Sequence, residues 1–362
     1  MKICLLGDTH FGVRNDSKVF HSFFEKFYTE TFFPFLKENK INTIIQLGDL
    51  FDRRKYINYL SLSECLRYFF KPLKDNNITM HTLIGNHDIF WKEKLAVNSP
   101  DLLLKDFDNI HIHQTATKIR IDNLNIDMIP WICKENEKDV LDFVKKSKNK
   151  LCIGHFELDG FLLNPGTLNV GGRSGKFLKK YEKVFSGHFH TKSKKDNIEY
   201  LGTPYELFWN DYKDAKGFYT FDTETLDTEF IKNENRIFYK FKYNDSKEDF
   251  NLDEFIKTIN KLKDFYKDTY VKVIVVNKSN PKTFDKMMEE IYKLSPHDVS
   301  VVEDHTIDFL GDDSDIINQA EDTVTIMTKY VDDLKINVNK DKIKNLVREL
   351  YIEALSTNTI NE

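Results

Sequence analysis

The feature that most constrains this chain is a series of five short motifs rich in Asp, His and Asn, each beside a glycine or a strand end. In chain order they are Asp8–His10, Gly48–Asp52, Gly85–Asp88, Gly154–His155 and Gly187–His190. Four of the five follow a short apolar run that is typical of a buried β-strand. Because ligands of α/β sheets bind beyond the carboxyl ends of the strands, we expect the five motifs to meet at one site.

The side chains of these motifs are types that bind transition-metal ions. Side chains two positions apart on an extended segment point the same way, so Asp8 and His10 can bind one ion together. Gly48 allows a tight exit from a strand and brings the Asp49 carboxylate between two ions. The expected ligands are Asp8, His10, Asp49, Asn86, His155, His188 and His190. This set suits two ions about 3.5–4 Å apart with one shared carboxylate.

A pair of such ions would acidify a bridging water and neutralise charge on phosphoryl oxygens during in-line attack. The leaving alkoxide then needs a proton, and His87, which has no ligand role in this scheme, is the expected general acid. Asp52 is the first candidate for holding the His87 imidazole in one tautomer, and Asp88 is the alternative. Any one motif alone is more often a turn beside a surface histidine, whereas five in this order predict a two-metal phosphoesterase centre.

The remaining histidines lack such a context, and we expect them to be structural or solvated. They are His21, His81, His111, His113, His297 and His305. The formal net charge of −5 excludes a globally basic nucleic-acid-binding protein, although a local basic rim is still compatible with a nuclease. The four separated cysteines and the lack of a signal peptide or of an apolar run of about 20 residues predict a cytoplasmic protein without a membrane segment.

Alternating strand-like and helix-like segments predict an α/β domain over residues 1–230. The strand-like runs are residues 3–6, 43–47, 79–84, 126–129, 151–153, 184–185, 200–201 and 218–221, and residues 19–39 and 61–76 have helical patterns. A polar segment at 233–249 is expected to be a crossing segment. Helical and strand patterns then alternate at 252–265, 270–276, 281–294 and 299–302. They predict a small α/β domain over 231–302, followed by an acidic linker at 303–315 and amphipathic helices within 316–362.

The five motifs resemble those of the calcineurin-like metallophosphoesterases over about residues 1–230. Within that superfamily they are similar to the SbcD-type DNA repair nucleases, as are Tyr200–Pro204 and Lys216–Phe218. The runs Ile129–Trp131 and Gly154–Leu158 are most similar to members of this branch from T-even-like phages. The resemblance implies a two-sheet β-sandwich flanked by helices, a DNA-capping domain at 231–302 and, for a phage protein, the host-cell cytoplasm.

The resemblance also implies roles for individual residues. One metal would be held by Asp8, His10, Asp49 and His190, and the other by Asp49, Asn86, His155 and His188, with His87 as the acid. The family favours two Mn²⁺ ions, although the ligands themselves do not exclude Mg²⁺, Zn²⁺ or Fe²⁺. The implied partners are DNA, a second copy of the chain through helices among residues 60–110, and an SbcC-type coiled-coil ATPase bound by 316–362. The alternative for that last segment is that its helices pack on their own domain.

The expected function is therefore a manganese-dependent DNA nuclease, with exonuclease and single-strand or hairpin endonuclease activity in double-strand-break repair and recombination. The alternatives are a small-molecule nucleotide phosphodiesterase and a non-catalytic scaffold. Gly48–Arg53 also resembles a protein-phosphatase signature, but Arg54 stands where glycine is expected, so a protein phosphatase is disfavoured. The candidate DNA-phosphate contacts, each of which is otherwise a solvated charge, are Arg53, Arg54, Lys55, Arg14 and Arg173, with Lys176 beside them.

Overall fold

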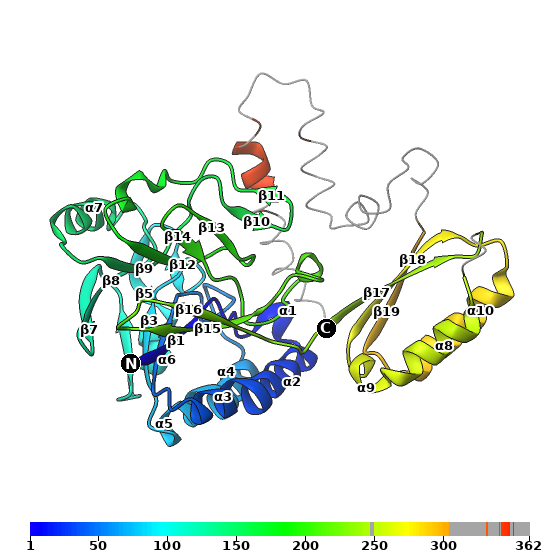
Figure 1. The fold of residues 1–362 in the computed structure, drawn as a ribbon. Coiled ribbons are helices and arrows are strands. Elements are labelled where there is room, and N and C mark those ends of the chain that lie inside the picture. Colours follow the sequence, from blue (N-terminus) through cyan, green and yellow to red (C-terminus); the bar gives the residue numbers. More distant parts are fainter. Residues whose placement is uncertain (247–249, 304–330, 332–339, 341, 348–349, 351–362) are drawn as a thin grey trace. The chain divides into compact units, whose positions relative to one another are not determined.

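The computed structural model describes residues 1–246, 250–303, 331, 340, 342–347 and 350 of the chain. The chain divides into two compact units, each of which is described by itself (Figure 1). The first consists of Met1–Leu207 and Lys213–Glu234, and the second of Phe208–Tyr212 and Asn235–Glu362. The division at 234 lies close to the boundary expected near residue 230. Among the described residues, no helix is long and apolar enough to cross a membrane.

Two six-stranded sheets form the core of the first unit. In spatial order, the first sheet contains β16 (Thr228–Lys232), β15 (Gly217–Asp222), β1 (Lys2–Leu6), β2 (Thr43–Gln46), β3 (Thr79–Leu83) and β6 (Ile110–His113). The second contains β13 (Ser193–Lys195), β14 (Ile198–Tyr200), β12 (Lys183–Gly187), β9 (Leu151–His155), β8 (Leu124–Ile129) and β7 (Thr117–Ile121). The central strands of each sheet pair in parallel, from β1 to β6 and from β8 to β14. Their carboxyl ends therefore lie at one edge of each sheet.

The two sheets pack face to face around one apolar cluster. Leu5 and Ile45 of the first sheet share this cluster with Ile153 and Phe185 of the second, and all four are at most 1% exposed. Strands buried on both faces read as continuous apolar runs, which is why these segments were recognisable in the sequence. The arrangement confirms the expected α/β class, in which two sheets are flanked by helices.

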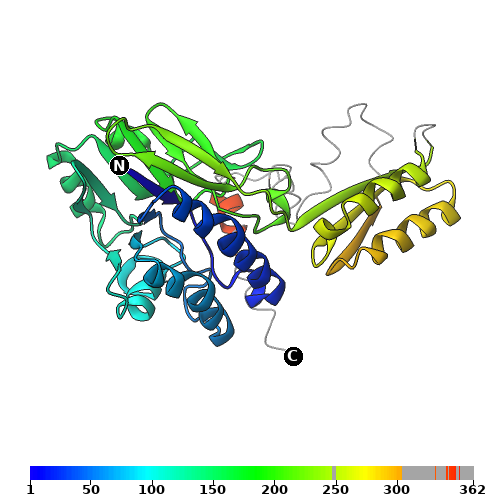
Figure 2. The ribbon, with the colours of Figure 1, turned by 60° about the horizontal axis from the view of Figure 1, so that its bottom comes forward.

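Two long helical segments cover the outer face of the first sheet (Figure 1, Figure 2). The first runs through α2 (Lys18–Phe27), a π-helical turn (Tyr28–Phe32) and α3 (Phe33–Glu38), and the second through α4 (Tyr59–Cys65), a π-helical turn (Leu66–Phe70) and α5 (Lys71–Asp75). Pro34 and Pro72 each lie two positions after the last residue of a π turn. Proline donates no hydrogen bond and clashes with the carbonyl four residues earlier, so the wider turn accommodates it within the helix. Many of the abundant phenylalanines pack here, as where the Tyr28 and Phe69 rings lie 4.6 Å apart.

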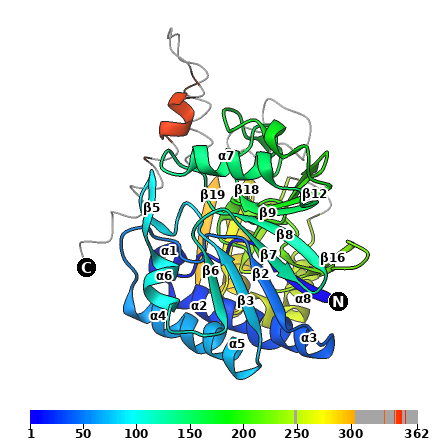
Figure 3. The ribbon, with the colours of Figure 1, turned by 90° about the vertical axis from the view of Figure 1, so that its left-hand side faces the viewer.

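Helix α7 (Glu137–Lys146) lies over the second sheet, on the far side from α4 and α5 (Figure 3). The shorter elements of this unit are α1 (Val13–Asp16), β4 (Ile89–Trp91), β5 (Lys94–Asn98), α6 (Ser99–Leu104), β10 (Leu162–Asn164), β11 (Thr167–Leu168) and a 3₁₀ turn at Gly175–Leu178. Of these, α1 is not a regular helix, because Arg14, Asn15 and Asp16 all have positive φ. The chain therefore makes a tight left-handed turn directly after the first motif.

The second unit is a three-stranded parallel sheet with helices packed against it. Its strands, in spatial order, are β17 (Phe238–Asn244), β18 (Tyr270–Asn277) and β19 (Asp298–Glu303), and its helices are α8 (Leu252–Lys261), α9 (Lys263–Tyr266) and α10 (Pro281–Lys293), with a 3₁₀ turn at Trp209–Asp211. Val273 of β18 and Met287 and Ile291 of α10 belong to one buried cluster. Asn280 caps α10 by accepting a hydrogen bond from the Thr283 amide, with Pro281 at the first helical position as expected.

One expectation for this unit is wrong. Residues 233–249 were expected to be a crossing segment, but 238–244 form β17, which pairs in parallel with β18. Tyr239, Phe241 and Tyr243 of this strand join the buried cluster, and Lys240 and Lys242 lie between them, although Phe238, in phase with the lysines, is also buried. The lysines gave the segment a polar composition that masked its period of two. The expected linker at 303–315 and the helices within 316–362 fall almost wholly outside the described residues.

Candidate metal centre

The five motifs lie at the carboxyl ends of five parallel strands. Asp8, Asp49 and Asn86 follow β1, β2 and β3 of the first sheet, and His155 and His188 end or follow β9 and β12 of the second. Asp8, His10, Asp49 and His155 are at most 1% exposed, and Asn86 is 8% exposed. The structure brings all seven expected ligand residues together, in groups that share members. Each sheet therefore supplies part of a single buried polar site.

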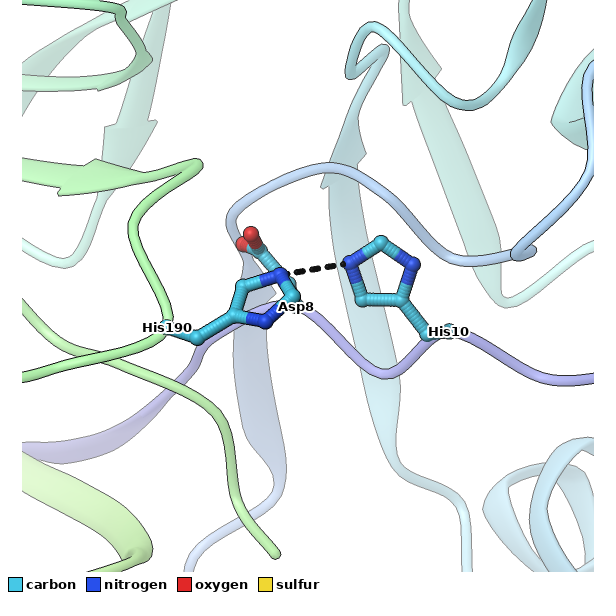
Figure 4. A group of neighbouring side chains, drawn as sticks. All are labelled: Asp8, His10 and His190. Carbon is cyan, nitrogen blue, oxygen red and sulfur yellow. Dashed lines mark hydrogen bonds between the residues drawn. The ribbon is translucent and has the colours of Figure 1, made fainter. Parts of the chain in front are cut away.

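The first group consists of Asp8, His10 and His190 (Figure 4). One ligand atom from each lies within 4.8 Å of the others, and the two Nε2 atoms of His10 and His190 are 3.1 Å apart. Asp8 Oδ2 accepts a hydrogen bond from the His188 amide at 2.8 Å. Within the described residues, Asp8 Oδ1 is buried and accepts no hydrogen bond. A buried carboxylate oxygen without a donor, facing two imidazoles, fits a bound cation.

The second group consists of Asp49, Asn86, His155 and His188. His155 Nε2 lies 3.3 Å from Asp49 Oδ2 and 3.0 Å from Asn86 Oδ1, and His188 Nδ1 lies 2.8 Å from the same amide oxygen. His155 Nδ1 donates to the carbonyl of Leu47 at 2.7 Å. That bond turns Nε2 toward the carboxylate and the amide, as the second shell of a metal-binding histidine does. Three imidazole or carboxylate groups and one amide oxygen are a suitable set for a divalent ion.

Asp49 joins the two groups. Its carboxylate converges with His10 on one side and with His155 on the other. Its φ of 52° is left-handed, and Gly48 before it has a φ of 99°. A Cβ atom on Gly48 would lie 2.5 Å from His155 Nδ1, so only glycine fits there. The left-handed turn also points the Asp49 carbonyl at the amides of Thr9 and His10, each at 3.1 Å. Backbone strain at this residue is thus compensated by contacts that join two motifs.

Charges in the metal-free centre are strongly coupled. Burial raises the pKa of Asp8 to about 7, although His155 opposes it. Burial also acts against ionisation of Asp49, but the neighbouring His155, His87 and His10 outweigh it and lower its pKa well below the ordinary value. Burial would lower the pKa of His10 and His155, yet the surrounding carboxylates raise both to about 9. Protonated histidines therefore compensate the carboxylates here, and bound cations would take over that role while protons leave.

The proposed acid, His87, is held by a backbone atom rather than by a carboxylate. Its Nδ1 donates to the carbonyl oxygen of Asp52 at 2.6 Å. The Asp52 carboxylate instead lies 3.3 Å from His10 Nδ1. The alternative partner, Asp88, accepts hydrogen bonds from the amides of Gly85 and Phe51. The expectation that the Asp52 or Asp88 side chain orients His87 is therefore not met, because both carboxylates are engaged elsewhere.

Two of the expected DNA-contacting arginines bind groups of the protein. Arg53 donates from Nη1 to Asp16 at 2.8 Å and from Nη2 to Asn15 at 2.7 Å. Arg54 donates from Nε to the carbonyl of Asn86 at 2.8 Å. Arg53 thus stabilises the left-handed turn after the first motif, and Arg54 supports the loop that carries Asn86. Both contacts give these residues a role in shaping the centre.

The other expected cations differ in their surroundings. Arg173 forms an ion pair with Glu137, with Nη1 2.6 Å from the carboxylate, and Arg14 donates from Nε to the carbonyl of Leu207 at 3.2 Å. Lys55 is exposed. Lys55 therefore presents a solvated charge near the centre, whereas the two arginines are partly engaged by the fold. Contact with DNA remains a prediction for all of them.

Two residues beside the centre were not assigned a role from the sequence. Trp131 follows the carboxyl end of β8, and its ring centroid lies 5.1 Å from that of His188. Lys216 is 3% exposed and donates from Nζ to the carbonyl of His190 at 2.7 Å and to Asp214 at 2.9 Å. Trp131 could have been found from its place after a parallel strand, as the expected ligand residues were. No comparable sequence signal marks Lys216, because the backbone carbonyl that it binds belongs to a residue remote in sequence.

Comparison with known proteins gives a consistent result. The sequence profile of the calcineurin-like phosphoesterase family matches residues 1–222 of this chain. The chain is 35% identical over 360 residues to exonuclease subunit 1 of Enterobacteria phage T4, which covers 98% of this chain and 99% of that protein. It is 26% identical over 231 residues to the DNA double-strand break repair protein Mre11 of Methanocaldococcus jannaschii, which covers 58% of this chain and 60% of that protein. With its strand-end group of Asp, Asn and His side chains, this chain belongs to the calcineurin-like phosphoesterase family and is a hydrolytic phosphoesterase.

Proposed function

We propose that this protein is a two-metal DNA nuclease that acts as an exonuclease and as a single-strand or hairpin endonuclease in double-strand-break repair and recombination. The observation that carries the proposal is the pair of ligand groups joined by Asp49, with His87 beside them. The similarity to an exonuclease subunit and to a double-strand break repair protein supports DNA as the substrate.

We assign one ion to Asp8, His10, Asp49 and His190, and the other to Asp49, Asn86, His155 and His188, with Mn²⁺ as the proposed metal. When bound, two such ions supply Lewis-acid stabilisation of the phosphoryl oxygens and a water of lowered pKa. The chain itself places these ligands on rigid strand ends. Hydrogen bonds from Arg54 and Lys216 to backbone carbonyls of the ligand loops hold them there.

His87 is the proposed general acid for the leaving alkoxide. Because the carbonyl of Asp52 only accepts hydrogen bonds, Nδ1 carries a proton, and Nε2 is the nitrogen that can pass one to the substrate. The His87 amide donates to Asp49 Oδ1 at 2.7 Å, which fixes the residue against the shared carboxylate. Burial lowers the His87 pKa, which makes the protonated ring a stronger acid and favours its return to the neutral form after the transfer.

The decisive experiment compares the purified protein with His87→Ala on linear DNA in the presence of Mn²⁺. We expect the variant to cleave roughly 10²–10⁴-fold more slowly, the usual contribution of general acid catalysis, while bound manganese measured by mass spectrometry stays the same. His111→Ala, which removes an exposed histidine away from the centre, serves as the control. Equal cleavage by His87→Ala would remove this residue from its role. Turnover of cyclic nucleotides without DNA cleavage would instead support the nucleotide phosphodiesterase alternative.

We further propose that the protein acts in the cytoplasm, as a homodimer, and with an SbcC-type ATPase that binds the C-terminal segment. Leu346 and Leu350, four positions apart in the sequence of that segment, are each 55% exposed, as expected of apolar side chains that bind a partner. Replacing both with Glu in the full-length chain should abolish co-purification with the ATPase and leave basal manganese-dependent cleavage intact. Unchanged co-purification would refute the assignment of this segment.

A further inference from the structure

A pocket of about 170 Å³ opens directly beside the second ligand group. It lies within the first unit and shares His155 with the metal centre. Trp131, Ile132 and Phe156 give it apolar walls, and Glu157 and Arg173 give it polar edges. None of these lining residues other than His155 has a role in the metal chemistry. Whatever occupies this pocket therefore lies next to a phosphate bound at the ions.

Trp131 is held firmly where the pocket meets the centre. Its amide donates to the carbonyl of Ile84 at 2.8 Å, and its own carbonyl accepts from Asn136 Nδ2 at 2.9 Å. Its ring centroid lies 5.1 Å from that of His188 and 6.1 Å from that of His155. The side chain is only half-buried. An indole that is fixed at its backbone and open on one side is suited to stacking against a flat ligand.

Another part of the wall is preformed by an isolated parallel β-bridge between Leu158 and Arg173. The amide of Arg173 donates to the carbonyl of Glu157 at 2.9 Å, and the amide of Asp159 donates to the carbonyl of Arg173 at 3.0 Å. Gly172 allows this close approach, because a Cβ atom there would lie 2.8 Å from the carbonyl carbon of Leu158. The pocket is thus a built feature of the loop after β9, and a ligand would not have to create it.

The chemistry of the walls favours a nucleobase over a phosphate. The Arg173 charge is compensated by Glu137 at 2.6 Å, which weakens its attraction for a phosphate. A nucleobase has an apolar face for Trp131 and polar edges for Glu157 and Arg173, and base–aromatic stacking contributes about 1–3 kcal/mol per base. A base inside a duplex is already stacked and paired, so only an unpaired base is free to enter.

We propose that this Trp131 pocket binds an unpaired nucleobase of the strand being cleaved, next to the scissile phosphate. This inference rests on the proposed nuclease function and deepens it, because it gives the centre a preference for frayed, single-stranded or hairpin DNA. The pocket acts on the substrate without touching the reacting atoms. Trp131 is therefore a specificity residue rather than a catalytic one.

The test compares wild type, Trp131→Ala and Trp131→Phe on a single-stranded oligonucleotide and on a 1,2-dideoxyribose phosphodiester dimer, a small ester without a base or any other aromatic ring. Trp131→Ala should raise KM for the oligonucleotide on the order of 10-fold, as expected for one lost stacking contact, and leave hydrolysis of the small ester unchanged. Trp131→Phe should restore most of the loss. Trp91→Ala, which removes an exposed indole outside the pocket, is the matched control.

The first measurement of a second arm uses the wild-type protein alone. Wild-type protein is given oligonucleotides with a single abasic nucleotide placed at successive positions along the cleaved strand. One position next to the cleaved bond should raise KM as much as Trp131→Ala does, and that variant should lose nothing further there. Equal KM for wild type and Trp131→Ala, or additive losses, would overturn the pocket assignment while DNA cleavage persists. If the wild type hydrolyses the small ester but no DNA, the proposed function itself fails.

Discussion

The first unit contains two clusters of histidines that look alike in geometry and differ in chemistry. In the metal centre, His10 and His190 have ring nitrogens 3.1 Å apart. At the edge of the first sheet, His81 of β3 and His113 of β6 have ring nitrogens 3.0 Å apart, with His111 packed beside them. The pKa of His10 is raised to about 9, although burial lowers that of His190 well below the ordinary value, whereas burial lowers the pKa of both edge histidines, His81 to about 3 and His113 to about 4.

The difference lies in the carboxylates. Asp52, Asp49 and Asp8 surround His10, whereas the pKa values of the edge cluster respond only to burial and to the neighbouring histidines. Among the described residues, every group of three or more candidate ligands with converging atoms belongs to the centre. Closely placed imidazoles alone repel added positive charge. Buried carboxylates are what make such a cluster a site for cations.

Removing the Asp49 carboxylate, which joins both ligand groups, should have the largest effect on the difference between the two histidine clusters. Asp49→Asn keeps the size of the side chain and an oxygen that can accept from the His87 amide, but it removes the charge between both ligand groups. We expect DNA cleavage to fall by roughly 10³-fold or more, because several kcal/mol of metal-dependent charge stabilisation is lost. Equilibrium dialysis should show fewer than two ions per chain.

The matched control is His113→Gln, which alters the edge cluster and should retain both ions and full cleavage. Thermal unfolding of each variant checks that the fold persists. Two ions bound to Asp49→Asn with wild-type affinity would show that charge at this position does not define the centre.

A smaller effect is expected from Asp52→Asn. The Asp52 carboxylate lies 3.3 Å from His10 Nδ1, so its loss removes support from a proposed metal ligand. Losing such a partner typically weakens metal affinity about 10–100-fold. The carbonyl that holds His87 is a backbone group and survives the substitution. A titration of activity with Mn²⁺ should therefore show a higher half-saturating concentration and nearly unchanged kcat at saturation.

The opposite pattern, a large fall in kcat with unchanged manganese dependence, would mean that the Asp52 side chain serves His87 after all. Asp101→Asn provides a control of the same chemistry on α6. A raised manganese requirement would support the contact of Asp52 with His10. A fall in kcat would support the sequence-based expectation that the Asp52 side chain orients His87.

The convergence of the expected ligand residues was predictable, because their signal is local. Asp8, Asp49 and Asn86 each come directly after a buried parallel strand, and strand ends in an α/β sheet converge. The strands could also be expected, because segments such as β1 and β9 contain short apolar runs, whereas their division into two sheets was implied only by the family resemblance. Strand β17 was missed because the lysines on its other face gave the segment the composition of a loop.

The finer contacts were not predictable, since they depend on atoms rather than on residue types. Sequence does not say whether Asp52 supports His87 through its carboxylate or its carbonyl. The left-handed φ of Asp49 decides where that side chain points, and it arises from contacts with a motif about forty residues away. The pairing of Arg173 with Glu137, 36 positions apart, likewise follows only from the tertiary fold.

The smallest effect concerns the edge cluster and its response to acid. The folded-state pKa values of His81 and His113 lie below the ordinary histidine value, so the unfolded chain binds more protons as pH falls below about 6.5. The His81–His113 pair therefore does not reduce the free energy of unfolding above that pH. It reduces this free energy increasingly as pH falls toward 4. We expect a loss of about 1–2 kcal/mol between pH 7 and pH 5 from this pair, allowing for partial relief when the cluster opens.

Urea unfolding of the metal-free protein at pH 7 and pH 5, compared with a His81→Gln/His113→Gln variant, measures this contribution. The variant should lose less stability over the same interval. His10 and His155 cannot produce this slope, because their raised pKa values keep them protonated in both states below about 6.5, and they act in the opposite direction between 6.5 and 9. Equal acid slopes in the two proteins would mean that the edge histidines bind protons as readily in the folded protein as in the unfolded chain, and their contrast with His10 and His155 would no longer stand.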